Sequence, residues 1–232
     1  MAADFIVAVD LGQAADYTAI CAVQRMPIKT GKFRDENGVH GSLEKTEEWI
    51  DHWRVGHLER MPLHTPYPQV SERVKAILQK VPSTADLVVD STGVGRPVVD
   101  MMRADGLKPI AATITSGGSE GRNDNGYLVP KKLLVSGTQI LMQNGQLKIS
   151  NKLALCETLV KEMLSFKVKM GDSGKASFEA WRESIHDDLV LALCLAIWWG
   201  RTTKTGWQKA STLKGLDKQM RDSAVRHYTY ED

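Results

Sequence analysis

The chain of 232 residues is long enough for one domain with a sizeable core, and its composition, 42% hydrophobic and 25% charged, is ordinary for a globular protein. The longest apolar run, residues 189–199, is too short to span a bilayer, and the N-terminus lacks the basic segment of a signal peptide. The cysteines, Cys21, Cys156 and Cys194, are widely spaced and odd in number, which favours a reducing compartment over a disulfide framework or a zinc motif.

The net charge of +2 says little about partners, but the distribution of charge says more. Residues 121–152 hold five basic residues against one acid, and residues 201–232 hold seven against four. Any single lysine in these stretches is most simply a solvated surface residue. The two stretches together make the second half of the chain locally basic.

The first half of the chain alternates apolar runs with polar turns. Residues 5–10 form a near-continuous apolar run typical of a central strand, and residues 18–25 predict its hairpin partner. Residues 27–46 are Gly-rich and charged, which predicts an exposed loop, and a third strand is expected within residues 49–59. A helix with one apolar face is predicted over residues 68–81.

The second half continues in the same α/β manner. Further strands are expected at 87–90 and 108–115, and an edge strand at 146–150. Further helices are expected up to about 104, over 130–143 and over 153–166, with a polar loop at 116–126 and a β-hairpin at 169–178. With three strands before the first clear helix, the pattern indicates an α/β fold.

A final apolar helix begins with two adjacent acids. Residues 186–200 read HDDLVLALCLAIWWG, and apart from its first residues this segment is apolar on every face, as in a buried helix. Burying Asp187 and Asp188 together is costly unless a bound cation compensates their charge. Asp188 is the favoured direct ligand, because its helical face continues through the small Ala192 and Ala196. Asp187 is expected to be a second ligand or a cap for the following backbone amides.

Two more acids, Asp10 and Asp90, each end an apolar strand. The crevice beyond the carboxyl ends of the strands is the usual ligand site of α/β sheets, although either acid alone is also a common turn residue. Together with the helix acids they predict a cluster of carboxylates that would repel one another without a metal. Such hard oxygen ligands suit Mg²⁺ or Mn²⁺, and two such ions can clamp both reacting oxygens of a phosphodiester.

The segments VDLGQAADYTAI, LVVDSTGVG and HDDLVLALCLA, in this order, resemble the nuclease domain of tailed-phage terminase large subunits. The resemblance covers residues 6–199, and the helix led by HDD is its most specific part. It implies an RNase H-like fold, related to RuvC-type resolvases, with a mixed central sheet flanked by helices. It also implies a metal-dependent endonuclease that cleaves double-stranded DNA during phage genome packaging, using two Mg²⁺ or Mn²⁺ ions.

The resemblance assigns roles to particular acids. Asp10 corresponds to the central acid of the first strand, Asp90 to the acid of the second motif, and Asp187 or Asp188 to the helix acid. Asp16 matches a further acid of some members, and it could equally be an ordinary loop residue.

Other polar side chains are expected to assist. His186 could transfer a proton or orient a carboxylate, although such a residue is more often a neighbour of a helix cap. Contacts with DNA phosphates, which position the duplex without reading its sequence, are expected from Arg122, Lys131, Lys132, Lys169 and Lys175.

The resemblance also sets expectations for organisation and partners. Residues 1–200 would be the nuclease domain and residues 201–232 a basic C-terminal tail. The expected partners are double-stranded DNA, the terminase ATPase motor, the small terminase subunit and the portal, in the cytoplasm of an infected or lysogenic bacterial host, with no membrane. The chain contains no Gly-x-x-x-x-Gly-Lys-Ser/Thr, so no nucleotide cofactor is expected here.

Two alternatives stay open on the sequence alone. The glycine-flanked turns also resemble the phosphate loops of actin-like and sugar-kinase ATP-binding proteins, but such proteins have no use for paired acids at the start of a buried helix. A non-catalytic DNA-binding packaging module is the other alternative, and it would be expected to have lost acids that are all present here.

Overall fold

The computed structural model describes residues 4–12, 16–37, 43–165, 169–170, 176–177 and 186–203. The order of its elements is β1 (Asp4–Asp10), β2 (Ala19–Asn37), β3 (Leu43–Arg60), α1 (Tyr67–Leu78), β4 (Asp86–Asp90), α2 (Gly95–Ala104), β5 (Pro109–Thr115), β6 (Gly121–Asn123), β7 (Gly126–Pro130), α3 (Lys131–Gln143), β8 (Leu147–Ile149), α4 (Cys156–Ser165), β9 (Lys169–Met170), β10 (Ala176–Ser177) and α5 (Asp188–Thr202). The predicted α/β class is confirmed.

Eight strands form one mixed sheet in the order β6-β7-β5-β4-β1-β2-β3-β8. Strands β1, β2 and β3 form an antiparallel meander, whereas β4 pairs parallel to β1 and β5 parallel to β4. The carboxyl ends of β1 and β4 therefore lie side by side at one edge of the sheet. The predicted hairpin partner of the first strand and the predicted edge strand β8 are both confirmed.

Helices cover both faces of the sheet, because successive strand residues point to opposite sides. Ile6, Ala8 and Val88 face α5, α3 and α4, while Val7, Val9 and Val89 face α1 and α2. Helix α5 carries hydrophobic side chains all round because it is buried between the sheet and other helices, and residues 188–198 are all buried. Its fully buried Ala192 and Ala196 are in the same cluster as the β1 side chains, as their small size predicts.

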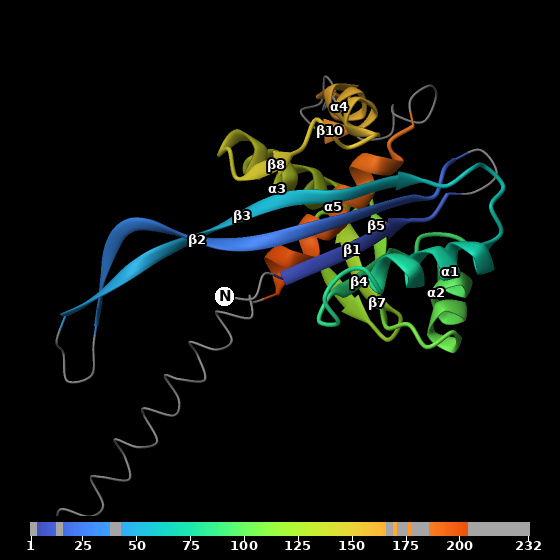
Figure 1. Ribbon diagram of the computed structural model, residues 1–232, viewed down its shortest axis with the longest axis horizontal. Helices are drawn as coiled ribbons and strands as arrows, with labels where there is room; N and C mark the ends of the chain where they lie inside the picture. Colours follow the sequence, from blue (N-terminus) through green and yellow to red (C-terminus); the bar gives the residue numbers. More distant parts are fainter. Residues whose placement is uncertain are drawn as a thin grey trace, which may run out of the picture.

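The prediction of an exposed loop at residues 27–46 is wrong. Strands β2 and β3 continue through most of this segment and pair up to Asn37 and Leu43. Figure 1 shows them extending as a two-stranded ribbon beyond the rest of the sheet. None of the ribbon side chains that the structure describes, at 26–33 and 47–50, is buried, and Ile28 and Phe33 are exposed. These positions therefore give no hydrophobic period in the sequence.

Smaller differences concern other boundaries. The predicted polar loop at 116–126 contains the three-residue strand β6, and the unpredicted β7 follows it. Helix α4 begins at Cys156 rather than at 153, and α5 continues two residues past the predicted domain boundary at 200. The predicted tail lies outside the described residues from position 204 on. None of the described helices combines the length and hydropathy needed to cross a membrane.

Candidate metal centre

Three buried carboxylates come together from three elements. Asp10 is the last residue of β1, Asp90 the last residue of β4, and Asp188 the first residue of α5, with exposed fractions of only 8%, 9% and 3%. Asp10 and Asp90 follow Val9 and Val89, which are paired in register, so their side chains leave the sheet on the side of α5. The sequence-predicted acids of the two strands and of the helix are thus neighbours in the fold.

The local sequence around Asp90 fixes this carboxylate. Its Oδ1 accepts hydrogen bonds from the backbone N–H of Thr92 at 2.8 Å and from the Thr92 hydroxyl at 2.5 Å. Thr92 Oγ1 in turn accepts from the N–H of Ile114 on β5 at 2.9 Å. A Cβ at Gly95 would lie 2.3 Å from the backbone oxygen of Asp90, so only glycine lets α2 begin this close to the strand end.

The acids disturb one another's ionisation. Burial raises the pKa of Asp10 well above its usual value, and the charges of Asp90, Asp188 and Asp187 raise it further. Burial also raises the pKa of Asp90, against the hydrogen bonds from Thr92 that lower it. Burial raises the pKa of Asp188 to about 6, although Arg60 and His186 oppose this shift. The metal-free site therefore favours proton uptake, as expected where like charges crowd in a poorly solvated place.

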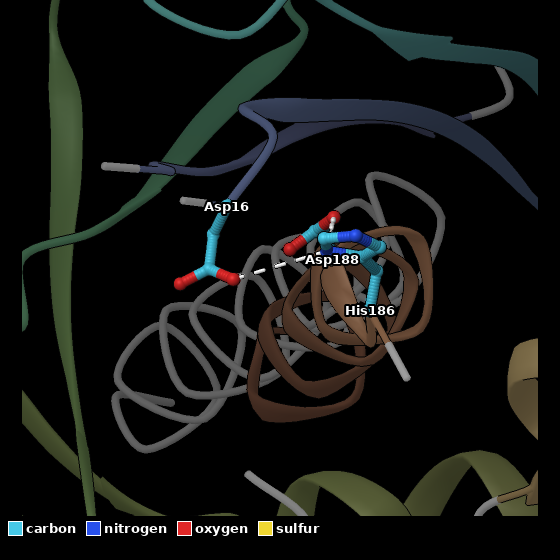
Figure 2. Close-up of side chains that lie close together, drawn as sticks. All are labelled: Asp16, His186 and Asp188. Atoms are coloured by element: carbon cyan, nitrogen blue, oxygen red, sulfur yellow. Dashed lines mark ion pairs between the residues drawn. The ribbon is translucent and has the colours of Figure 1, made fainter. Parts of the chain in front are cut away.

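A second group of potential ligands lies on the side of Asp188 toward solvent. Figure 2 shows Asp16, His186 and Asp188 pointing toward one another. Asp16 Oδ1 lies 3.8 Å and Asp188 Oδ2 4.0 Å from His186 Nδ1, and potential ligand atoms of the three residues lie within 4.8 Å of one another. The His186 ring also packs edge-to-face on Tyr17. Asp188 belongs to both groups and so links the strand-end acids to the exposed Asp16.

Asp187 lies at the N-cap position of α5, but of the two roles expected for it, second ligand or cap of the following amides, the cap is wrong. Its side chain makes no capping hydrogen bond. Instead, its Oδ2 accepts a hydrogen bond from Nζ of Lys131, the first residue of α3, at 2.9 Å. Because adjacent helix residues point about 100° apart, Asp187 faces α3 while Asp188 faces the sheet.

The capping partner comes from another helix. Glu162 on α4 is only 3% exposed, and its Oε2 accepts the backbone N–H of Val190 at 3.0 Å. Its Oε1 pairs with Arg60, the last residue of β3, whose Nη2 also lies 3.4 Å from Asp188 Oδ2. Burial raises the pKa of Glu162 to about 7, against the Val190 amide and Arg60, which lower it. Sequence reasoning missed both residues.

The residues predicted to contact DNA do not all lie near the buried acids. Lys132 is exposed at the start of α3, next to Lys131. Arg122 on β6 is exposed with its guanidinium 5.0 Å from the Tyr127 ring centroid, and both line a cavity of about 380 Å³ with Trp199. Since Trp199 lies eleven residues along α5, about 16 Å from Asp188, the structure does not bring Arg122 to the acids. The side chain of Lys169 and the whole of Lys175 lie outside the described residues.

The residues present suit a divalent cation. Asp188 Oδ2 is buried and has no hydrogen-bond partner among the described residues, although Asp10 and Asp90 add further negative charge beside it. A buried carboxylate oxygen without a hydrogen-bond partner, beside two further carboxylates, is a suitable ligand for Mg²⁺ or Mn²⁺.

Comparisons with known proteins agree with this architecture. Residues 64–198 match the family described as "Terminase RNaseH-like domain". The fold is similar to the large terminase nuclease from thermophilic phage G20c, with a TM-score of 0.54 and 20% identity over 84% of this chain and 81% of that one. It is also similar to the large terminase from a second thermophilic bacteriophage, with a TM-score of 0.53 and 11% identity over 85% of this chain and 40% of that one. Comparison with curated proteins gives no match.

The mixed sheet with helices on both faces is therefore an RNase H-like fold, as predicted. Since the matched region is more than half of the chain, the chain belongs to the terminase RNase H-like domain family.

Proposed function

We propose that this chain is a metal-dependent endonuclease that cleaves double-stranded DNA, with little sequence preference, during phage genome packaging. The observation that carries the proposal is the convergence of the buried Asp10, Asp90 and Asp188 from two strand ends and a helix start. Membership of the terminase family supports the link with packaging.

In this proposal Asp10, Asp90 and Asp188 hold the divalent cations, two ions of Mg²⁺ or Mn²⁺, and Asp187 and Asp16 complete the ligand set. Asp187 would first have to leave Lys131, with which it pairs at 2.9 Å. When bound, the cations supply the Lewis acidity that activates a water and stabilises the leaving 3′ oxygen.

The chain's own side chains prepare the site. Thr92 orients the Asp90 carboxylate through two hydrogen bonds, and Arg60 offsets part of the negative charge beside Asp188. His186, between Asp16 and Asp188, is suited to orient a carboxylate or to exchange a proton at the solvent side of the site.

DNA would approach from the side where Asp16 and His186 are exposed. Lys131 and Lys132, on the helix whose first residue contacts Asp187, are the best-situated of the proposed phosphate contacts, and Lys169 and Lys175 would flank the same region. The further proposed partners are the terminase motor, the small subunit and the portal, in the host cytoplasm where packaging occurs.

Plasmid cleavage tests the proposal. Supercoiled plasmid is incubated with the purified chain in Mn²⁺, Mg²⁺, Ca²⁺ or EDTA, together with Asp10→Asn and the matched control Asp100→Asn. Asp100 is an exposed acid on α2 that pairs with Arg103, away from the buried carboxylates. Nicked or linear products that need Mn²⁺ or Mg²⁺ and disappear only in Asp10→Asn support the proposal.

Other outcomes point to the alternatives. Metal-dependent cleavage that persists in Asp10→Asn would mean that the acids are not the catalytic site. ATP binding without nicking would favour an actin-like protein, and DNA binding without cleavage in any metal would favour a non-catalytic packaging module.

A further inference from the structure

Two charged side chains that are not among the proposed metal ligands lie near Asp188. Arg60 reaches the site from the end of β3, with 16% of its side chain exposed, and Glu162 reaches it from α4, with 3% exposed. Tyr17 covers the guanidinium, whose Cζ lies 4.9 Å from the ring centroid. The two side chains form an ion pair with each other, and Arg60 Nη2 lies 3.4 Å from Asp188 Oδ2.

Each carboxylate oxygen of Glu162 binds a different group, one on α5 and one on β3. Oε2 accepts the N–H of Val190, the third residue of α5, which has no partner within its own helix. Oε1 holds the Arg60 guanidinium. One buried carboxylate thereby connects the start of the core helix to the end of β3, next to the residue proposed to bind metal.

The ion pair leaves Arg60 only partly satisfied. Its Nε is buried without a hydrogen-bond partner in the described structure, and the same is true of Asp188 Oδ2. Asp188 Oδ2 is therefore a second acceptor, 3.4 Å from Arg60 Nη2. Arg60 does not donate a hydrogen bond to this oxygen while it is bound to Glu162. If Arg60 closed on Asp188, a positive charge and a donor would occupy the oxygen that a cation needs.

We propose that Glu162 is a positioning residue that holds Arg60 at ion-pair distance from Asp188 and prevents it from donating a hydrogen bond to Oδ2, so that this oxygen stays available to a divalent cation. The inference rests on the proposed function to the extent that Asp188 is taken as a metal ligand. Residues behind the ligands commonly change metal affinity by about 10–100-fold when replaced.

Direct metal binding provides the test. Mn²⁺ is titrated calorimetrically at about pH 8, above the raised pKa values of Asp188 and Glu162, into the purified wild-type chain, Glu162→Gln, Arg60→Met and the double variant. Glu162→Gln should weaken Mn²⁺ binding by about tenfold, because the released guanidinium pairs with Asp188. The double variant should recover binding to within about threefold of wild type, since no guanidinium remains to compete. A purely structural role of Glu162 would not predict this recovery.

The matched control is Glu59→Gln. Glu59 precedes Arg60 on β3, points to the opposite face and pairs with Arg73 at 2.7 Å, so its loss should leave Mn²⁺ affinity unchanged. Equal affinity of Glu162→Gln and wild type, or a double variant that binds as weakly as Glu162→Gln, would overturn the inference. If Glu162→Gln does not fold, Arg60→Met alone decides, because it must bind Mn²⁺ at least as tightly as wild type.

These readouts separate the two proposals. A wild-type chain that binds Mn²⁺ in the expected order of variants but does not cut plasmid would reject the proposed function and retain the positioning role. A chain that cuts plasmid with unchanged Mn²⁺ affinity in Glu162→Gln would do the reverse.

Discussion

The two ends of α5 treat buried charge in opposite ways. At the C-terminal end, Arg25 is only 3% exposed, and it donates to the backbone oxygens of Gly200 and Thr203 and pairs with Asp4 at 2.6 Å. Its positive charge thus faces the negative end of the helix dipole. Trp199 donates its indole N–H to Asp86 at 2.8 Å. This end stabilises the fold because its charges have complementary partners.

At the N-terminal end, like charges gather. Asp188 benefits from the positive end of the helix dipole, but the charge of the adjacent Asp187 raises its pKa. The charges of Asp90, Asp188 and Asp187 in turn raise the pKa of Asp10. A buried Asp188 oxygen lacks a hydrogen-bond partner among the described residues. The same helix is thus stabilised by complementary charges at its C-terminal end, whereas its N-terminal end lies among carboxylates that suit a cation.

The largest effect is expected from a substitution at the N-terminal end of α5. Asp188→Asn should reduce plasmid cleavage in Mn²⁺ by on the order of a thousandfold or more, because it removes a charge that the transition state requires. Asp187→Asn should cost less, since Asp187 pairs with Lys131 rather than facing the strand acids. Initial cleavage rates of the two variants measure the difference. An Asp187→Asn variant that is the more impaired of the two would reverse the assignment of roles within the pair.

A substitution at the C-terminal end of α5 should lower the stability of the fold and leave metal binding intact. Arg25→Met removes a buried cation from two carbonyls and Asp4, which should lower the free energy of unfolding by about 3 kcal/mol. Urea denaturation at room temperature measures this, and Mn²⁺ affinity of the folded variant should match wild type. Arg103→Met, which removes an exposed pair with Asp100, is the control and should change stability by less than about 0.5 kcal/mol. Similar losses in both variants would contradict this stabilising role of Arg25.

The pH dependence of metal-free stability sharpens the same contrast. Because burial raises the pKa of Asp188 to about 6 and that of Glu162 to about 7 in the folded chain, the folded state keeps protons that the unfolded state has already lost. These two groups should therefore lower the stability as pH rises from about 4 to about 7, with the full penalty above that range.

Thermal unfolding in EDTA at several pH values, wild type against Asp188→Asn, isolates this contribution. Relative to wild type, the variant should gain stability as pH rises from about 4 to about 7, and Mn²⁺ should stabilise only wild type above that range. A difference between the two proteins that does not change with pH would mean that the pKa of Asp188 is not raised in the folded chain.

The smallest effect is expected at the surface beside the site. Lys132→Ala should reduce the slope of log affinity against log salt concentration for duplex DNA by about 0.9, equally for unrelated sequences. Fluorescence anisotropy in Ca²⁺ at several salt concentrations measures it. Lys80→Ala is the control, because Lys80 is an exposed lysine two residues after the end of α1, on the opposite side of the sheet. Equal slopes for Lys132→Ala and wild type would remove Lys132 from the DNA contacts.

How far the sequence predicts the structure depends on where hydrophobic burial leaves a pattern. The strands that end in Asp10 and Asp90 are buried on both faces, and α5 is buried all round, so continuous apolar runs reveal all three. In the ribbon formed by the extensions of β2 and β3, none of the described side chains at 26–33 and 47–50 is buried, and the charged and glycine residues of this segment suggested a loop instead.

The same dependence on apolar runs explains which residues of the site the sequence predicts and which it does not. Strand-end and helix-start acids are visible as carboxylates at the ends of apolar runs. One signal in the sequence could have predicted Arg60, because in a meander of three antiparallel strands the third strand ends level with the first. The register Asp10–Ala19–Arg60 places Arg60 at that end of the sheet. Glu162 left none, because its contacts with Val190 and Arg60 exist only after α4 has docked.

The position of α5 in chain order has a consequence for synthesis. This helix packs on β1 and β2, yet it follows Asp10 by 178 residues (188 − 10), which at about 5–20 residues per second is a delay of roughly 10 to 35 seconds on the ribosome. During that time the side of the sheet that α5 will cover still exposes Ile6, Ala8 and Val88. The nascent chain therefore holds two of its buried acids for many seconds before the third arrives, and the complete cluster can form only when the last described helix docks.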